Sequence, residues 1–387
     1  MSFSLSIKDG LESFTRDLLA AAVRGELEPV CGRDREIQEL IVILLRQTKN
    51  NPVLVGEAGV GKTAVVEGLA QKVASGNVPE ALKSVRILAL SHIDLIAGTS
   101  LRGQYERRLQ SIIEGASSDA NAVLFVDELH NLIGAGTAIG APMDAANMMK
   151  PALAGGRLRV IGATTQSEYE LYIRSDSALE RRFHPVRIQE LTREQAIEVL
   201  VARRRRLEMH HLVAISDEAI CAAVDLSLEY LPGRKLPDRC LDLLDMACAH
   251  MRVSRETSKS PIVEELSRRR AELLAQERIA VDDILTIAEA RGTPLEAFSR
   301  GTFRVLEMVG QGVETLITGQ RTERPPLPPP DSIRRLQSSD PAGRLSRCHQ
   351  ERLLIEDRLR DQLDRSGSCV TAEHIKNTLH RASTDRY

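Results

Sequence analysis

The chain has 387 residues, a length that predicts about two or three domains, and its 42% apolar and 27% charged residues are typical of a soluble globular protein. A net charge of −2 gives no general attraction for nucleic acid or anionic membrane, and no apolar run approaches the ~18 residues of a membrane span. The six cysteines form no CxxC pair and the N-terminus has no signal-peptide pattern, so we expect a cytoplasmic protein with no nucleic acid or membrane partner.

The first half of the chain alternates between helical patterns and short apolar runs. Apolar residues at helical spacing predict one helix over residues 11–24 and a second helix after Gly32. Short buried strands separated by helices indicate βαβ units, hence a parallel sheet covered on both faces. The strands are expected at 52–55, 86–90, 122–126 and 158–162, and the helices between and after them at 62–73, 105–116 and 143–153.

From Thr192 onward the pattern is only helical, which predicts a separate helical domain. The prolines of 325–330 predict a stiff linker, and the charged tail beyond it has few apolar residues apart from two short helical stripes at 351–363 and 372–381. We therefore expect a tail that is partly disordered and mechanically separate. The expected division is a helical arm at 1–30, an α/β domain at 31–190, a helical domain at 191–256, a helical extension at 257–320, and the linker with its tail at 321–387.

A phosphate-binding loop follows the strand at 52–55 and opens the next helix. It matches G-x-x-x-x-G-K-[ST] and consists of Gly56, Glu57, Ala58, Gly59, Val60, Gly61, Lys62 and Thr63. Glycines let backbone N–H groups surround phosphates, and the helix N-terminus adds partial positive charge. We expect Lys62 to bind the β- and γ-phosphates of ATP and the Thr63 hydroxyl to bind Mg²⁺.

Two carboxylates end the strand at 122–126. Asp127 is expected to hold Mg²⁺, directly or through water, and Glu128 to polarise the water that attacks ATP. Alone, two acids after a strand also fit a simple helix cap, but the phosphate loop upstream favours the catalytic role. The strand at 158–162 leads to Thr164 and Thr165, either of which can orient the water or serve as a helix N-cap.

Several ordered motifs resemble the first ATPase domain of the Clp-type AAA+ unfoldases, over about residues 12–320. That family includes two-ring disaggregases and the ATPase that recycles contractile sheaths in type VI secretion, and Tyr230-Leu-Pro-Gly-Arg is closest to the secretion branch. The motifs are Cys31-Gly-Arg-Asp, Asn50-Asn-Pro-Val-Leu-Val-Gly-Glu, Asp127-Glu-Leu-His, Met149-Lys-Pro-Ala-Leu, Gly162-Ala-Thr-Thr, Ala178-Leu-Glu-Arg-Arg-Phe and Leu236-Pro-Asp-Arg.

The resemblance implies an AAA+ P-loop domain with a five-stranded parallel sheet, a helical lid, and an ATP-dependent homo-oligomer of six subunits. Arg181 and Arg182 match the arginine fingers that reach a neighbour's ATP, and Thr165, or alternatively Thr164, takes the sensor role. Arg239 stands where a lid residue meets the phosphates in some members. The substrate pore loop corresponds to Leu101, Arg102 and Gly103, with Leu in place of the usual aromatic residue.

The chain also departs from the family pattern. We expect no N-terminal substrate-binding domain, no room between Arg255 and Val281 for a long coiled-coil insertion, and no second ATPase domain after the joint at 303–320. The first hypothesis is an ATP-driven remodeller that pulls on protein substrates through Leu101 and the loop at 133–142. The alternatives are a non-translocating ring whose tail recruits a partner protein, and a truncated remnant of a two-ring protein. A metabolic kinase is disfavoured by the paired arginines and the helical lid.

Overall fold

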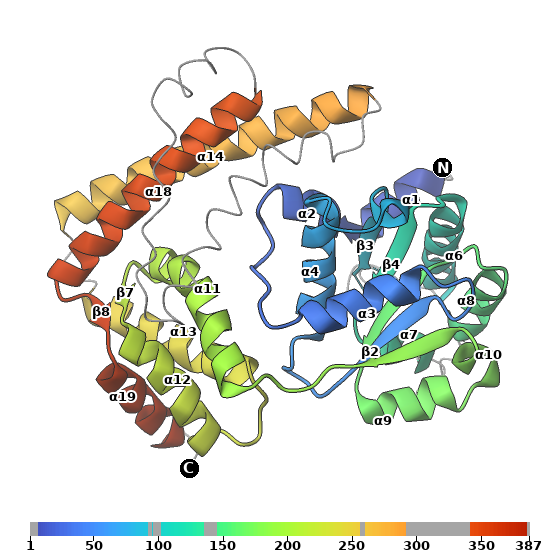
Figure 1. Cartoon of the computed structure of the whole chain (residues 1–387), viewed down its shortest axis with the longest axis horizontal. Coiled ribbons are helices and arrows are strands. Elements are labelled where there is room, and N and C mark those ends of the chain that lie inside the picture. Colours follow the sequence, from blue (N-terminus) through green and yellow to red (C-terminus); the bar gives the residue numbers. More distant parts are fainter. Residues whose placement is uncertain are drawn as a thin grey trace. The chain divides into compact units, whose positions relative to one another are not determined.

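The computed structural model describes residues 7–91, 95, 102–134, 145–255, 260–291 and 341–384 (Figure 1). The chain divides into two compact units, Met1–Glu190 and Leu191–Tyr387. The first unit is an α/β domain and the second is built mainly of helices, so the predicted fold class is confirmed. None of the helices in the described ranges is long and apolar enough to cross a membrane.

A six-stranded sheet forms the centre of the first unit, in the order β1-β3-β4-β5-β2-β6. Five strands are parallel, as predicted, and the short strand β1 (Thr15–Asp17) adds an antiparallel edge beside β3. Strands β3 and β4 have the predicted bounds, whereas β5 begins two residues later than predicted. The parallel strands are β2 (Asn51–Val55), β3 (Arg86–Leu90), β4 (Ala122–Val126), β5 (Val160–Thr164) and β6 (Phe183–Arg187).

Helices cover both faces of this sheet, which explains why its central strands are continuously apolar. Successive side chains of β4 point to opposite faces, so Leu124 and Val126 join the core cluster with α6, α7 and α8, while the buried Val123 and Phe125 face the other side. The helices are α1 (Ile7–Phe14), α2 (Leu18–Val23), α3 (Asp34–Leu44), α4 (Lys62–Ala74), α6 (Arg102–Ser118), α7 (Leu129–Gly134), α8 (Ala145–Ala154), α9 (Gln166–Glu168) and α10 (Ser177–Glu180), with a 3₁₀ turn at Glu80–Leu82 and a π turn at Tyr169–Arg174.

The single helix predicted over 11–24 is wrong, because β1 interrupts it. The Thr15 hydroxyl donates to the Leu11 carbonyl at 2.7 Å, and the Asp17 carboxylate accepts the Leu19 and Ala20 N–H groups at 2.9 and 3.0 Å. These local hydrogen bonds end α1 and begin α2, because short polar side chains compete with a continuous helix. The freed backbone then pairs with β3.

The second unit begins with three helices: α11 (Arg193–His211), α12 (Asp217–Tyr230) and α13 (Asp238–Arg255). The predicted capping box of Thr192 with Gln195 and the predicted N-cap at Ser216 are both confirmed. The chain continues through α14 (Pro261–Arg291), α18 (Pro341–Arg365) and α19 (Ala372–Thr384), with the two-residue strands β7 (Ala214–Ile215) and β8 (Cys369–Val370).

The expectation of a mechanically separate tail is wrong for residues 341–384. Strand β8 pairs in parallel with β7, α19 packs on α12 and α13, and the Ile375 side chain is completely buried. On α18, Leu359 and Leu363 pack against Met209 at the end of α11. The tail thus completes the helical core that α11 begins. The prolines at 325–330 and the predicted joint at 303–320 lie outside the described residues.

Between Arg255 and Val281, where we expected no room for a long coiled-coil insertion, the chain forms only part of α14, but a helical pair extends over a longer part of the chain. The chain leaves the lid helices after α13 and returns to them at β8, and in between it forms two long helices that pack on each other, α14 and α18. They run antiparallel, since Asp283 pairs with Arg344 whereas Arg270 pairs with Glu356. This helical pair is visible in Figure 1.

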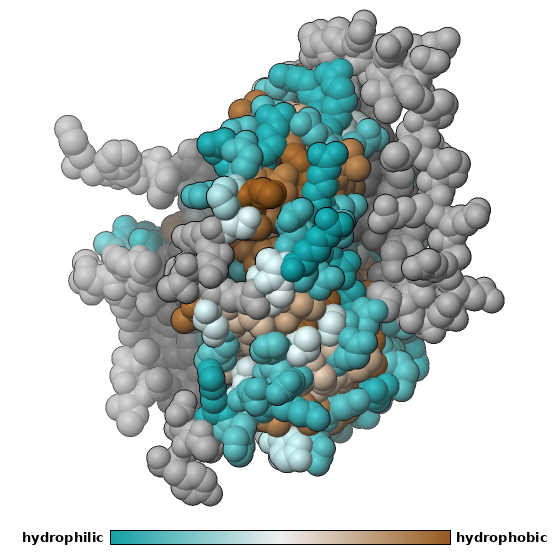
Figure 2. Space-filling view, turned by 90° about the vertical axis from the view of Figure 1, so that its left-hand side faces the viewer, coloured by the Kyte–Doolittle hydropathy of each residue, from teal (hydrophilic) through white to brown (hydrophobic). Residues whose placement is uncertain are grey.

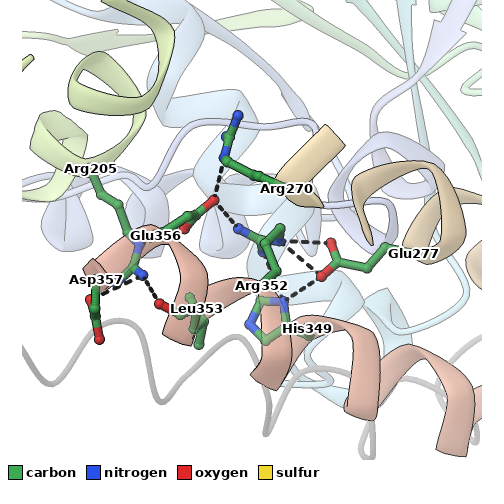
Figure 3. A network of polar contacts seen from close by, with 8 residues as sticks. All are labelled: Arg205, Arg270, Glu277, His349, Arg352, Leu353, Glu356 and Asp357. Carbon is green, nitrogen blue, oxygen red and sulfur yellow. Dashed lines mark hydrogen bonds and ion pairs between the residues drawn. The ribbon is translucent and has the colours of Figure 1, made fainter. Parts of the chain in front are cut away.

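A network of charges ties α18 to both α11 and α14 (Figure 3). The buried Glu356 carboxylate accepts hydrogen bonds from Arg205, Arg270 and Arg352, at 2.7, 2.7 and 2.8 Å. Burial alone would raise the pKa of Glu356, but the three guanidinium groups lower it to about 2. The charged contacts therefore connect the helical pair to the lid.

The coloured part of the surface drawn in Figure 2 is mostly hydrophilic, with smaller hydrophobic areas between the polar residues.

Candidate functional site

The phosphate-binding loop lies between the carboxyl end of β2 and the first turn of α4. Gly61, with φ of 90°, is the N-cap of α4, a conformation that glycine adopts at little cost. A Cβ at Gly56 would lie 2.6 Å from the Ile188 carbonyl oxygen, so a larger residue would push the loop away from β6. The two glycines thus account for a loop whose backbone N–H groups stand at the start of a long helix.

Lys62 lies at the centre of this loop. Its Nζ donates to the carbonyls of Gly56 and Glu57, at 2.9 and 3.0 Å. Burial lowers the pKa of Lys62, and the nearby carboxylates of Asp127, Glu168, Glu57 and Glu128 oppose that shift. The ammonium group therefore lies inside the loop, and a cation bound there would be close to the same carboxylates.

Thr63 and Asp127 meet where the loop faces β4. The Thr63 hydroxyl donates to Asp127 Oδ2 at 2.7 Å, and Asp127 Oδ1 accepts the Glu128 N–H at 3.0 Å. A hydroxyl and a carboxylate side by side are the oxygen ligands that Mg²⁺ prefers, and Mg²⁺ takes its remaining ligands from phosphates and water. Among the described residues, no group of three or more His, Cys, Asp or Glu is placed so that it could hold a metal ion by itself.

Glu128 stands in an unusual backbone conformation, with φ of 49°. The left-handed region is costly for a residue with a Cβ, and such strain occurs often at functional positions. The Asn131 amide holds the exposed Glu128 carboxylate through a 2.6 Å hydrogen bond. The next residue, Leu129, anchors the turn because its side chain is completely buried against Gly162.

Thr164, Thr165 and His130 converge on one carboxylate oxygen of Glu168. The Thr164 hydroxyl, the Thr165 N–H and His130 Nδ1 each lie 3.0 Å from Glu168 Oε2. Burial would raise the pKa of Glu168, but these hydrogen bonds and the proximity of His130 lower it. The Thr165 hydroxyl caps α9, in a capping box with Glu168. The Thr164 hydroxyl is buried and bound to both Glu168 and His130.

Arg181 and Arg182 lie at the other end of the sheet from the phosphate loop. Phe183, the next residue, pairs with Asn51 at the start of β2, whereas the loop follows Val55 at the end of that strand. The two ends are separated by about 13 Å at ~3.3 Å per residue. Neither guanidinium group has a hydrogen-bond or ion-pair partner within the described ranges. Both line a pocket of about 380 Å³ with Lys150, Pro151, Leu153, Ala154, Ala178 and Leu179.

Several residues around these sites were not predicted to act there. Arg33 is 4% exposed and donates through Nη2 to the carbonyls of Val60 and Gln189, at 2.5 and 2.9 Å, so it holds the phosphate loop against the end of the domain. For Glu168, the spacing T-x-x-E of a capping box was a usable sequence signal. For Asn131 the sequence carried no comparable signal, because its contact depends on the turn after β4. His130 and Arg33 belong to the motifs Asp127-Glu-Leu-His and Cys31-Gly-Arg-Asp, but those motifs do not reveal partners on other elements.

Other predicted residues remain without a structural test. Arg239 is buried in the second unit, where its Nη1 donates to the Leu231 carbonyl at 3.1 Å. Leu101 and most of the loop at 133–142 lie outside the described residues. Arg102 and Gly103 begin α6.

Comparisons with known proteins match both units of the chain. The model of the ATPase family associated with various cellular activities (AAA) matches residues 52–189, and that of the AAA lid domain matches residues 192–291. The chain is 50% identical over 262 residues to the chaperone protein ClpB of Aquifex aeolicus, a match that covers 68% of this chain and 26% of that protein. It is also 50% identical over 248 residues to ClpC of Staphylococcus saprophyticus, the ATP-binding subunit of an ATP-dependent Clp protease, with 64% and 30% covered.

Solved structures give the same picture. The ADP complex of Hsp104 from S. cerevisiae is matched with a TM-score of 0.60 and 34% identity, over 72% of this chain and 52% of that one. The extended conformation of the Hsp104:casein complex gives a TM-score of 0.58 at 34% identity, over 76% and 52%. The chain therefore spans about a quarter to a third of the curated relatives and about half of the solved chains.

Proposed function

Since this chain belongs to the Clp-type AAA+ ATPases, with one ATPase domain matched, we propose that it hydrolyses ATP to ADP and phosphate and uses the energy to remodel protein substrates. The observation that carries the proposal is the contact of Thr63 with Asp127 beside Lys62. It joins a phosphate-binding loop to the acidic end of β4, which is what an ATP-Mg²⁺ site needs.

Binding falls to the loop from Gly56 to Thr63. Its backbone N–H groups and Lys62 would exchange their present internal contacts for phosphate oxygens, and the α4 N-terminus adds partial positive charge. Thr63 and Asp127 would hold Mg²⁺, which when bound neutralises negative charge on the phosphates.

Glu128 is proposed as the group that orients the attacking water and accepts its proton. A carboxylate can polarise a water that is already held in line, and Asn131 keeps this carboxylate in one orientation. The hydrogen-bonded group of Thr164, His130 and Glu168 lies at the end of the adjacent strand β5, so Thr164 shares the sensor role that the sequence gives first to Thr165.

A ring completes this site in the proposal. Arg181 and Arg182 are separated from the phosphate loop of their own domain by the length of β2, and their guanidinium groups lack partners among the described residues. A neighbouring subunit that placed its ATP at the pocket of these arginines would supply the missing anion. Guanidinium groups there offset the charge that develops in phosphoryl transfer. We therefore propose an ATP-dependent homo-oligomer, with six subunits as the resemblance implies.

The proposed substrate is a protein. The similar proteins are named as a chaperone and as the ATP-binding subunit of a protease, and one matched Hsp104 structure is a complex with casein. We propose that the ring acts on unfolded or partly folded chains in the cytoplasm, with Leu101 as the residue of first contact.

The test is phosphate release by the purified full chain, with and without casein, beside unfolding of a fluorescent reporter protein. The proposal expects ATPase activity that casein stimulates and that unfolds the reporter. Phosphate release that no protein substrate stimulates, with the reporter still folded, would leave an ATPase without a remodelling function.

A further inference from the structure

Lys150 on α8 makes an ion pair that reaches across to the segment carrying the two arginines. Its Nζ lies 2.7 Å from Asp176 Oδ2 and donates to Asn147 Oδ1 at 3.0 Å. The Lys150 contact is the main cause that lowers the pKa of Asp176. Asp176 is therefore held as a carboxylate by a residue from another helix.

Asp176 in turn fixes the start of α10. Its Oδ1 accepts the N–H groups of Ala178 and Leu179, at 3.0 and 3.2 Å, so it is the N-cap of this short helix. A helix of one turn depends strongly on its cap, because nucleation is costly and few other hydrogen bonds hold it. The two oxygens of Asp176 thus link α8, through Lys150, to the backbone of α10.

The other end of α10 leads directly to the arginine pair. The Arg182 N–H donates to the Leu179 carbonyl at 2.9 Å, and the Arg182 carbonyl accepts from Asn51 Nδ2 at 3.3 Å. The completely buried Phe183 then starts β6. The backbone of Arg181 and Arg182 is therefore set by the cap at Asp176 on one side and by β2 on the other.

From this chain of contacts we infer that Lys150 is a positioning residue for Arg181 and Arg182, acting through Asp176 and α10. The inference rests on the proposed function, in which these arginines serve ATP held by a neighbour. Lys150 also lines their pocket, which contains three cationic side chains and no acidic one.

The expected effect is larger on turnover than on stability. The Lys150 and Asp176 side chains are 27% and 30% exposed, and partly exposed ion pairs contribute about 0–1 kcal/mol. By contrast, a misplacement of a catalytic group by about 1 Å can cost about 100-fold in rate. We expect Lys150→Met to lower kcat by about 10- to 100-fold, with the KM for ATP changed less than about twofold, because ATP binds at the opposite end of β2.

The experiment measures kcat, KM and thermal midpoint for the full chain and four variants: Lys150→Met, Lys150→Arg, Arg181→Ala and the double variant Lys150→Met/Arg181→Ala. Lys150→Arg can keep the ion pair and should restore most of the lost kcat. The double variant should be little slower than Arg181→Ala alone, since two residues that act through one contact are not additive. Lys83→Met is the matched control, because Lys83 is 22% exposed and also forms a single ion pair, with Glu80 at 2.6 Å.

The position of the effect is tested with mixed rings. Subunits carrying Glu128→Gln are to be mixed with subunits carrying Arg181→Ala and Arg182→Ala, so that only the first kind supplies arginines. Adding Lys150→Met to the Glu128→Gln subunits should lower the activity that the mixture recovers by about 10- to 100-fold. Adding Lys83→Met should leave it unchanged.

Three results would overturn the inference. The first is a normal kcat for Lys150→Met together with a lowered kcat for Arg181→Ala. The second is a loss of kcat in Lys150→Met that is accompanied by a large fall in thermal midpoint and is also present in Lys150→Arg. The third is normal turnover in Arg181→Ala, which would also remove the proposed role of a neighbour's arginines and is thereby distinguished from the first two.

Discussion

The side-chain amide of Asn51 donates a hydrogen bond to the backbone carbonyl of Arg182, at 3.3 Å. This contact places the arginine pair at the first residue of β2, whereas the phosphate loop begins just after its last residue. The phosphate loop and the arginine pair therefore lie at opposite ends of one strand, and in the proposed function a second subunit brings its arginines to the loop.

Lys62 and Glu128 should fail in different ways when replaced. Lys62→Ala removes the ammonium group that lies within the loop, and we expect ATP binding to fall below detection in equilibrium titration with a fluorescent nucleotide. Glu128→Gln keeps the contact of Thr63 with Asp127, so it should bind ATP with nearly wild-type affinity and turn over at least about 100-fold more slowly. Wild-type turnover by Glu128→Gln would refute its role.

Asn131 should affect the rate through Glu128. Asn131→Leu removes the 2.6 Å hydrogen bond while roughly conserving volume, and we expect kcat to fall by about 10-fold with little change in the KM for ATP. Steady-state kinetics with Asn131→Gln as the partial-rescue variant measures this. An equal loss of ATP affinity would show that Asn131 serves the loop and not the carboxylate.

The end of the chain should be required for a stable second unit. Ile375→Asp places a charge in a completely buried position of α19 and should destabilise the protein by about 3 kcal/mol or more in urea unfolding. Leu354→Asp is the matched control, since Leu354 on α18 is 57% exposed and a surface change costs within about 0.5 kcal/mol. Equal stability of the two variants would contradict this and would show that residues 341–384 form a mechanically separate tail, as the sequence suggested.

The Glu356 network predicts a particular pH dependence of stability. The folded pKa of Glu356, about 2, lies below the unfolded value of ~4.3, so its stabilisation is fully present above that value and is lost as the pH falls toward 2. We expect Glu356→Gln to be less stable than the wild type by about 2–3 kcal/mol at pH 7, and the gap to shrink below about pH 4.

Urea unfolding at several pH values measures that gap. Glu351→Gln is the control on the same helix, because Glu351 is half exposed and, within the described ranges, pairs with Arg269 alone. Its stability should differ little from the wild type at any pH. A gap for Glu356→Gln that is the same at pH 3 and pH 7 would contradict the network's electrostatic origin.

Sequence reasoning predicted the parallel sheet and the nucleotide motifs because their signals are local. The apolar run at 122–126 is followed at once by its two acids, and the phosphate loop is one continuous segment between a strand and a helix. The pairing of β7 with β8 could not be predicted in this way, since each strand has only two residues and they lie far apart in the chain. Two-residue strands have no periodicity to detect, so the packing of α19 on α12 and α13 could not be predicted either.

The contact partners of single polar residues could not be predicted from the sequence either. Lys150 and Asp176 are separated by β5, α9 and the π turn, and Arg33 and Gln189 lie 156 residues apart in the chain. At 15–17 the apolar residues have helical spacing, but the hydrogen bond that Thr15 donates and those that Asp17 accepts end one helix and begin another. The errors therefore fall where tertiary contacts or side-chain caps override a local pattern.

The most direct test of the central claim is complementation between two subunits that are inactive for different reasons. Glu128→Gln subunits keep both arginines, and Arg181→Ala/Arg182→Ala subunits keep the base. Each should be nearly inactive alone, and a 1:1 mixture should recover about a quarter of wild-type turnover, because about one interface in four combines an intact base with intact arginines in a randomly mixed ring. A mixture no more active than the mean of its two components, or full activity of the arginine variant alone, would contradict an ATPase site completed by its neighbour.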